Sequence, residues 1–188
     1  MHARSKAAVA AAAILMTTAC TTTSSTKAAP PASPTPPAPA ASPSPSATRY
    51  AFGQSVTTNN AASGTTATAT VLGYQQGITA QQSADAEFGT TGYVWAALEI
   101  KVCSVKGQIA TSRLPWVLAY ADGSRIEPSG TTYGDFPKPE YPFEAKLKAG
   151  DCVRGKTTYA VPAAQRPARI LYTTPVLPEP AEWSVPAS

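Results

Sequence analysis

Tyr93-Val-Trp-Ala-Ala-Leu-Glu-Ile-Lys-Val-Cys-Ser-Val105 is the longest stretch of this 188-residue chain in which apolar residues recur at every second position. From Val94 to Val102 the even-numbered residues are all apolar, so their side chains fall on one side of an extended chain. The odd-numbered positions are mixed and include Trp95, Glu99 and Cys103. Because this alternation is typical of a strand with one buried face, the stretch predicts the central strand of a β-sheet.

Shorter runs on both sides of this stretch predict further strands, separated by turn-forming residues. Asp122-Gly123 is a hairpin signal, residues 75–92 predict a long loop with at most one helical turn, and residues 129–142 predict a second long loop. No amphipathic helix is indicated. Seven to nine short strands therefore predict an all-β fold, an antiparallel Ig-like β-sandwich over residues 49–175, followed by a weakly docked C-terminal tail over residues 176–188. The expected flanking strands are Phe52–Thr58, Thr65–Tyr74, Leu114–Ala121, Arg125–Glu127, Phe143–Leu147, Cys152–Val161 and Arg169–Thr173.

The first 19 residues have the pattern of an export signal. A short basic start precedes an apolar run, Ala7–Met16, that is about half the length needed to cross a bilayer. The sequence Thr17-Thr18-Ala19-Cys20 resembles the lipobox of bacterial lipoproteins, although Thr17 stands where leucine is preferred. The resemblance implies a diacylglycerol thioether on Cys20 and hence a membrane anchor on the outer face of the cell membrane. The alternative is cleavage after Ala19 and release of a free secreted protein.

Residues 20–48 predict a disordered linker that joins Cys20 to the folded domain. They are almost entirely Thr, Ser, Ala and Pro, and Lys27 is the only charged residue in the segment from 21 to 48. No side chain there is large enough to build a core, so the segment is expected to stay extended. It acts as a spacer, and glycosylation of its hydroxyl groups is left open.

The three cysteines of the chain predict one disulfide. Thiols pair in the oxidising space outside the cell, and lipid on Cys20 leaves Cys103 and Cys152 to pair with each other. The alternative is two separate buried thiols. Both cysteines share the parity of charged neighbours, Lys101 and Arg154, rather than that of the apolar positions. We therefore expect the bridge at a strand end, joining neighbouring strands or a strand and a loop, and not across the core.

The composition argues against several classes of function. The single histidine is His2, in the segment expected to be removed, so the mature chain lacks the commonest general base and metal ligand. We accordingly expect no enzyme, cofactor or metal site. Loss of Arg4 and Lys6 leaves 13 basic against 11 acidic residues, a net charge of +2, and no basic cluster of the kind that binds nucleic acid.

Two pairs of acidic residues deserve comparison with catalytic carboxylates. Asp85 and Glu87 lie close together in the first predicted loop, and Asp135 and Glu140 in the second. Glycoside hydrolysis needs two carboxylates on opposite sides of a sugar, and cation sites need several converging oxygens. Proximity in the sequence provides neither arrangement. We expect solvated surface charges, and keep a carboxylate-based envelope hydrolase as the alternative.

Four aromatic residues in the second loop form the most interesting candidate for binding. Tyr133, Phe136, Tyr141 and Phe143 lie among three prolines, which stiffen the loop. A stiff aromatic loop suits contact with a cell-wall glycan or another envelope protein. Because aromatic residues usually bury, we expect these rings instead to cap one open end of the sandwich, and keep binding as the alternative. Trp95, on the mixed face of the central strand, is a second candidate, but we expect a neighbouring loop or the tail to cover it.

The order of these features resembles a known family over about residues 50–175. It is similar to the extracellular Ig-like domain of bacterial lipoproteins, the DUF4352 or telokin-like group. The features that carry the resemblance are the central strand, Trp116–Tyr120 with Asp122-Gly123, Leu147 with Gly150, Val153-x-Gly155 and Tyr159-x-Val161-Pro162. Cys103 departs from this pattern, because the group has a polar residue there. The group has no established catalytic residues, so the resemblance implies a lipid-anchored module that binds or scaffolds at the envelope. A purely structural envelope protein is the other alternative.

Overall fold

The central strand predicted from the alternation is β4 (Tyr93–Lys106), in a computed structural model that describes residues 48–187. The predicted signal, the predicted lipidation site Cys20 and all of the predicted linker except Thr48 lie outside the described residues. The inner face of β4 is buried as expected, with Ala96, Leu98 and Ile100 fully excluded from solvent. Within residues 48–187 no helix is long and apolar enough to cross a membrane.

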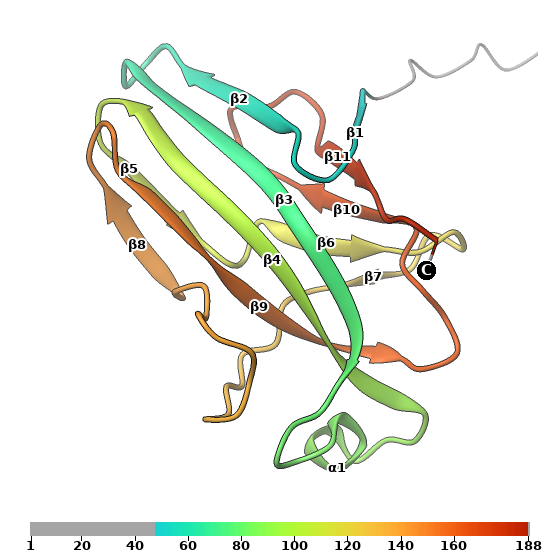
Figure 1. Ribbon diagram of the computed structural model, residues 1–188. Helices are drawn as coiled ribbons and strands as arrows, with labels where there is room; N and C mark the ends of the chain where they lie inside the picture. Colours follow the sequence, from blue (N-terminus) through green and yellow to red (C-terminus); the bar gives the residue numbers. More distant parts are fainter. Residues whose placement is uncertain (1–47, 188) are drawn as a thin grey trace, which may run out of the picture. The chain divides into compact units, whose positions relative to one another are not determined.

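β4 lies in the middle of a four-stranded antiparallel sheet (Figure 1). Its neighbours are β3 (Thr65–Ile78) and β9 (Cys152–Pro162), and β2 (Ser55–Asn60) forms the far edge beyond β3. The long strands β3, β4 and β9 run side by side through most of the domain (Figure 1). This sheet supplies one layer of the sandwich.

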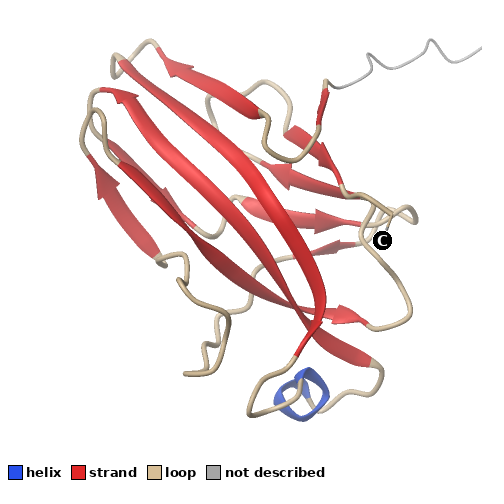
Figure 2. Ribbon diagram, in the orientation of Figure 1, coloured by secondary structure: helices blue, strands red, loops and turns tan. Residues whose placement is uncertain are grey.

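The second layer is a five-stranded sheet with the order β1-β11-β10-β6-β7, in which only the β1–β11 pair is parallel (Figure 2). A third, two-stranded sheet pairs β5 with β8. The short helix α1 (Ala84–Phe88) lies between β3 and β4 in the chain. The strand bounds are β1 (Arg49–Tyr50), β5 (Ile109–Ser112), β6 (Trp116–Ala119), β7 (Arg125–Ile126), β8 (Glu144–Leu147), β10 (Arg169–Tyr172) and β11 (Ala181–Ser184).

The two main sheets enclose one apolar core, which confirms the predicted β-sandwich. Trp116, Tyr159 and Trp183 are fully buried in it, and the Trp116 ring packs 4.4 Å from that of Tyr172, centroid to centroid. The expectation of a weakly docked tail over residues 176–188 is wrong. Trp183 lies on β11, which pairs with β10, and its Nε1 donates to the carbonyl of Gln54 at 2.9 Å. The sequence does not reveal β11, because a four-residue strand is too short to show the alternation of apolar and polar residues by which strands are predicted.

Residues 48–187 contain eleven strands rather than the predicted seven to nine. β1, β5 and β11 were not predicted as strands, and β1 and β7 are only two residues long. β3 continues to Ile78, beyond its expected end at Tyr74. Its pairing with β4 shifts register between Val71 and Gly73 and again between Gln76 and Ile78. Each such irregularity breaks the two-residue period, so the sequence pattern is lost while the strand goes on.

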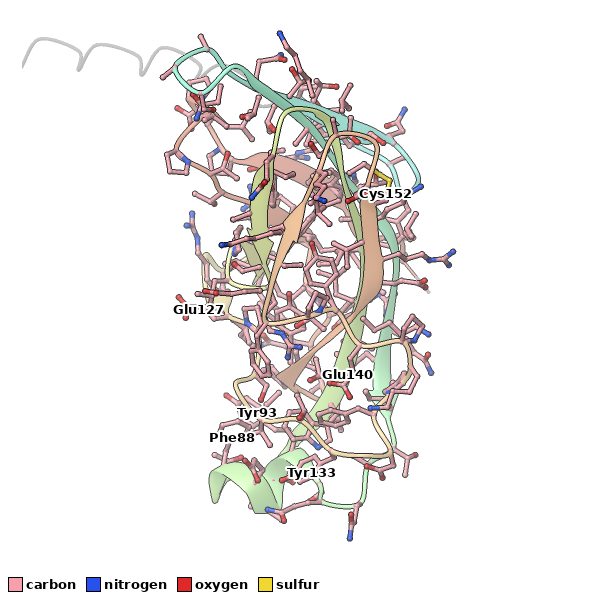
Figure 3. All side chains as sticks on the ribbon, turned by 90° about the vertical axis from the view of Figure 1, so that its left-hand side faces the viewer. Phe88, Tyr93, Glu127, Tyr133, Glu140 and Cys152 are labelled. Carbon is pink, nitrogen blue, oxygen red and sulfur yellow. A yellow bond between two sulfur atoms is a disulfide. The ribbon has the colours of Figure 1, made fainter. Side chains whose placement is uncertain are left out.

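Cys103 and Cys152 form the predicted disulfide at the end of the β4–β9 pair. The two residues are directly opposite each other, with their Cα atoms 4.0 Å apart. Cys152 is exposed and Cys103 is half-buried, and Figure 3 shows the bond at the margin of the domain. The parity argument is confirmed: the bridge joins neighbouring strands of one sheet and does not cross the core.

Candidate ligand-binding groove

A second apolar cluster lies on the outer face of the four-stranded sheet, where Trp95 and Ala97 point away from the sandwich core. Ile78, Ala84 and Phe136 cover them. The Trp95 side chain is only 2% exposed, and its Nε1 donates to the carbonyl of Gln82 at 2.8 Å. Trp95 is therefore covered by neighbouring loops, as expected, and offers no contact surface.

The rings of this outer cluster pack edge to face around Trp95. The Phe136 and Phe88 centroids lie 5.0 Å and 5.9 Å from that of Trp95, and the Tyr133 centroid lies 5.2 Å from that of Phe136. Such contacts fix the orientation of each ring as well as its position. The cluster thus forms a rigid support beneath α1.

The four aromatic residues of the second loop do not form one surface. Phe136 belongs to the outer cluster and Tyr133 is half-buried against it, whereas Tyr141 is buried in the sandwich core and shares a 2.8 Å hydrogen bond with Thr111. Only Phe143 is clearly exposed, at 52%, and its ring lies 3.7 Å from the Arg113 guanidinium carbon. The predicted four-ring binding surface is thus corrected, because successive rings of the loop point in different directions and most of them cover the sheets.

Asp85 and Glu87 are structural rather than freely solvated. The Asp85 carboxylate accepts hydrogen bonds from the backbone N–H groups of Tyr93 (2.7 Å) and Gly92 (3.1 Å). The Glu87 carboxylate accepts from the hydroxyl groups of Tyr133 and Thr131, which lowers the pKa of Glu87. The same bond to Glu87 raises the pKa of Tyr133 to about 12. The pair thus ties α1 to the start of β4 and to the second loop.

The second acidic pair does not gather around a common centre. Asp135 is exposed, and Glu140 forms an ion pair with Lys138 and a backbone bridge with Lys156. Among residues 48–187 there is no group of three or more His, Cys, Asp or Glu side chains arranged to hold a metal ion.

A groove of about 480 Å³ lies beside the outer cluster, and two exposed rings line it. Phe88 is 52% and Tyr93 37% exposed, although aromatic residues elsewhere in the domain are mostly buried. Figure 3 shows the two rings near α1 and Glu127 on the same side of the domain. The lining includes Phe88, Thr90 and Tyr93 from the α1–β4 region and Arg125, Glu127 and Ser129 from β7 and the segment after it.

Local structure fixes the backbone that carries both rings. Gly89 ends α1 directly after Phe88 by adopting a left-handed conformation with φ of 60°. Tyr93 is the first residue of β4, opposite Pro162 of β9, and Asp85 holds its backbone. Arg125 pairs with Ala119 across β7 and β6. The backbone on both sides of the groove is therefore held by regular structure and hydrogen bonds.

Sequence reasoning missed this groove. Phe88 and Tyr93 lie at the two ends of a segment that has no hydrophobic periodicity, and Arg125 and Glu127 lie far away in the sequence. One local signal was available: a lone aromatic residue followed by glycine at a helix end and another directly after a glycine at a strand start. That signal does not say that the two rings share a groove.

Comparison with known proteins supports the fold. No protein-family model matches the chain, and a search of curated proteins found no match either. A secreted protein of Mycobacterium tuberculosis, MPT63, has a similar crystal structure, with a TM-score of 0.57. The likeness covers 75% of this chain and 99% of that chain at 13% sequence identity. At this identity the two proteins share a β-sandwich fold, and nothing further follows for this chain.

Proposed function

We propose that this protein is a non-catalytic binding module of the cell envelope that holds a glycan in the groove lined by Phe88 and Tyr93. The observation that supports this is the exposure of two aromatic rings, 52% and 37%, at one groove in a domain that buries most of its other rings. Exposed rings on a rigid support are a contact surface that loses little entropy on binding.

The chemistry of the groove favours a sugar over an ion or a nucleic acid. The rings of Phe88 and Tyr93 supply apolar faces to the groove. Arg125 supplies hydrogen-bond donors and Glu127 supplies acceptors for the hydroxyl groups of a sugar. One basic and one acidic residue leave the groove without a strong net charge. A neutral ligand with both C–H faces and hydroxyl groups fits this combination.

The glycan proposal is tested by sedimentation of the full exported chain with purified cell wall. Phe88→Ala combined with Tyr93→Ala should lower the affinity about tenfold or more, because each ring contact contributes about 1 kcal/mol. Leu114→Ala is the matched control, since Leu114 is 71% exposed and does not line the groove. Equal binding by the wild type, the double variant and the control would reject the groove as the binding site. No binding by any of them would favour a purely structural role.

We further propose that the module is held at the outer face of the cell membrane by lipid on Cys20. Two facts support the anchor: the segment Thr17–Cys20 resembles a lipobox, and the pairing of Cys103 with Cys152 leaves Cys20 as the one cysteine without a partner inside the chain. The fold shared with a secreted protein agrees with a location outside the cytoplasm. Cys20→Ala should release the protein into the medium, and unchanged membrane association would contradict the anchor.

A further inference from the structure

The Asp85 carboxylate joins the two parts of the chain that carry the exposed rings of the groove. Asp85 lies in the first turn of α1, and Phe88 follows it by three residues on the same helix. The two carboxylate oxygens accept from the backbone N–H groups of Tyr93 at 2.7 Å and Gly92 at 3.1 Å. One residue therefore belongs to the helix that carries the first ring and also holds the backbone that carries the second.

The main chain of Asp85 holds the residues between the two rings. Its carbonyl accepts from the N–H groups of Gly89 and Thr90. The groove wall on this side consists of Phe88, Thr90 and Tyr93. Each of them lies on the helix of Asp85 or forms a hydrogen bond with it. Asp85 does not itself line the groove, so it acts on a ligand only through these three residues.

The other contacts in this region leave the spacing of the two rings to Asp85. Tyr93 is held on β4 by its place opposite Pro162 of β9. Phe88 is held against β4 by its ring contact with Trp95, at 5.9 Å between centroids. Apolar packing is largely non-directional, whereas hydrogen bonds from two successive N–H groups to one carboxylate are directional and charge-assisted. The carboxylate therefore fixes where α1 lies along the start of β4.

We propose that Asp85 is a positioning residue for glycan binding, whose carboxylate sets the spacing of Phe88 and Tyr93 so that one sugar chain contacts both rings. This role rests on the proposed function, because it needs a ligand that spans the two rings. Contact residues in binding sites must be held within about 0.5 Å by the hydrogen bonds of the groups behind them. Asp85→Ala removes the carboxylate but keeps the carbonyl bonds at the end of α1 and the β4–β9 pairing, so it breaks only the tie between the two ring-bearing elements.

A double-mutant cycle tests this role. Binding of the full exported chain to purified cell wall is measured by sedimentation for the wild type, Asp85→Ala, Phe88→Ala and the combined variant. Asp85→Ala alone should lower the affinity about fivefold, the equivalent of one hydrogen bond. In the Phe88→Ala background the same change should lower it less than about twofold, because no second ring remains to be positioned. A role in overall stability alone would lower binding equally in both backgrounds.

Two further variants refine the test. Asp85→Asn keeps one acceptor oxygen for the two N–H groups and should lie between the wild type and Asp85→Ala. Asp151→Ala is the matched control. The Asp151 carboxylate likewise accepts from a backbone N–H, that of Lys148 at 3.1 Å, but it lies in the β8–β9 turn and does not line the groove. This variant should bind as the wild type does.

The outcomes separate the role of Asp85 from the proposed function. Binding by the wild type with no loss in Asp85→Ala, or with an equal loss in both backgrounds, would overturn the role of Asp85 and leave the glycan site standing. No binding by the wild type would reject the proposed function and the role of Asp85 with it. Urea unfolding shows whether each variant is folded, and Asp85→Asn replaces Asp85→Ala in the cycle if the alanine variant does not fold.

Discussion

The two faces of β4 carry two different apolar clusters. The inner cluster lies between the main sheets and draws fully buried residues from strands throughout the domain, among them Leu98, Trp116 and Trp183. The outer cluster is small and is built around Trp95 by α1, the end of β3 and the second loop. The inner cluster holds the sandwich together, whereas the outer one packs against Phe88, one of the two exposed rings of the proposed binding groove. The main core and the proposed binding face thus lie on opposite faces of one strand.

The largest expected effect comes from the inner cluster. Trp116→Ala should destabilise the domain by about 4–5 kcal/mol, because it removes a fully buried ring from the centre of the core. Urea unfolding should show one cooperative transition at a lower midpoint. A loss confined to α1 and the second loop would contradict the assignment of Trp116 to the main core.

The disulfide comes next. Cys103→Ala combined with Cys152→Ala opens a covalent loop with a sequence separation of 49 residues and should cost about 4 kcal/mol on the chain-entropy model. The midpoint of urea unfolding should fall, while hydrogen exchange in α1 stays as in the wild type because the bridge lies at the other end of β4. Faster exchange in α1 would show that the outer cluster depends on the bridge.

A smaller, local effect is expected from the outer cluster. Phe136→Ala removes a side chain that is 2% exposed and should cost about 3 kcal/mol, with the loss concentrated in residues 84–93 and 129–136. Hydrogen exchange measured by mass spectrometry should accelerate in these two segments and stay slow in β10 and β11. Leu114→Ala, at an exposed apolar position, is the control and should change nothing.

The smallest effect concerns the bond between Glu87 and Tyr133. The pKa of Tyr133 is raised from 10.0 to about 12. The stabilisation of the fold by its bond to Glu87 is therefore fully present below pH 10 and is lost as the pH rises through about 12. The pKa of Glu87 is lowered from 4.5, so its contribution is present above pH 4.5 and is lost as the pH falls through the lowered value. Glu87→Gln should return the Tyr133 pKa towards 10, as followed by NMR titration of the ring. An unchanged Tyr133 pKa would contradict this tie.

The sequence predicted the inner face of β4 and the placement of the disulfide because both depend only on alternation along regular strands. It did not predict which residues build the outer cluster, because Phe136 comes from a loop about forty positions after Trp95, and alternation says nothing about what covers the second face. It missed the full length of β3 because register shifts break the period. The sequence did not predict the groove for the same reason: Phe88, Tyr93 and Arg125 line one groove only because the fold brings distant segments together.

Hydrogen exchange of the full exported chain with soluble cell-wall glycan fragments tests the central claim most directly. If the groove beside the outer cluster binds glycan, exchange should slow in residues 88–93 and 125–130, and the protection should disappear in the combined Phe88→Ala, Tyr93→Ala variant. Residues 109–112 should exchange at the same rate with and without glycan, since β5 lies outside that groove. Protection elsewhere, or none at saturating glycan, would contradict the claim that this face is the binding face.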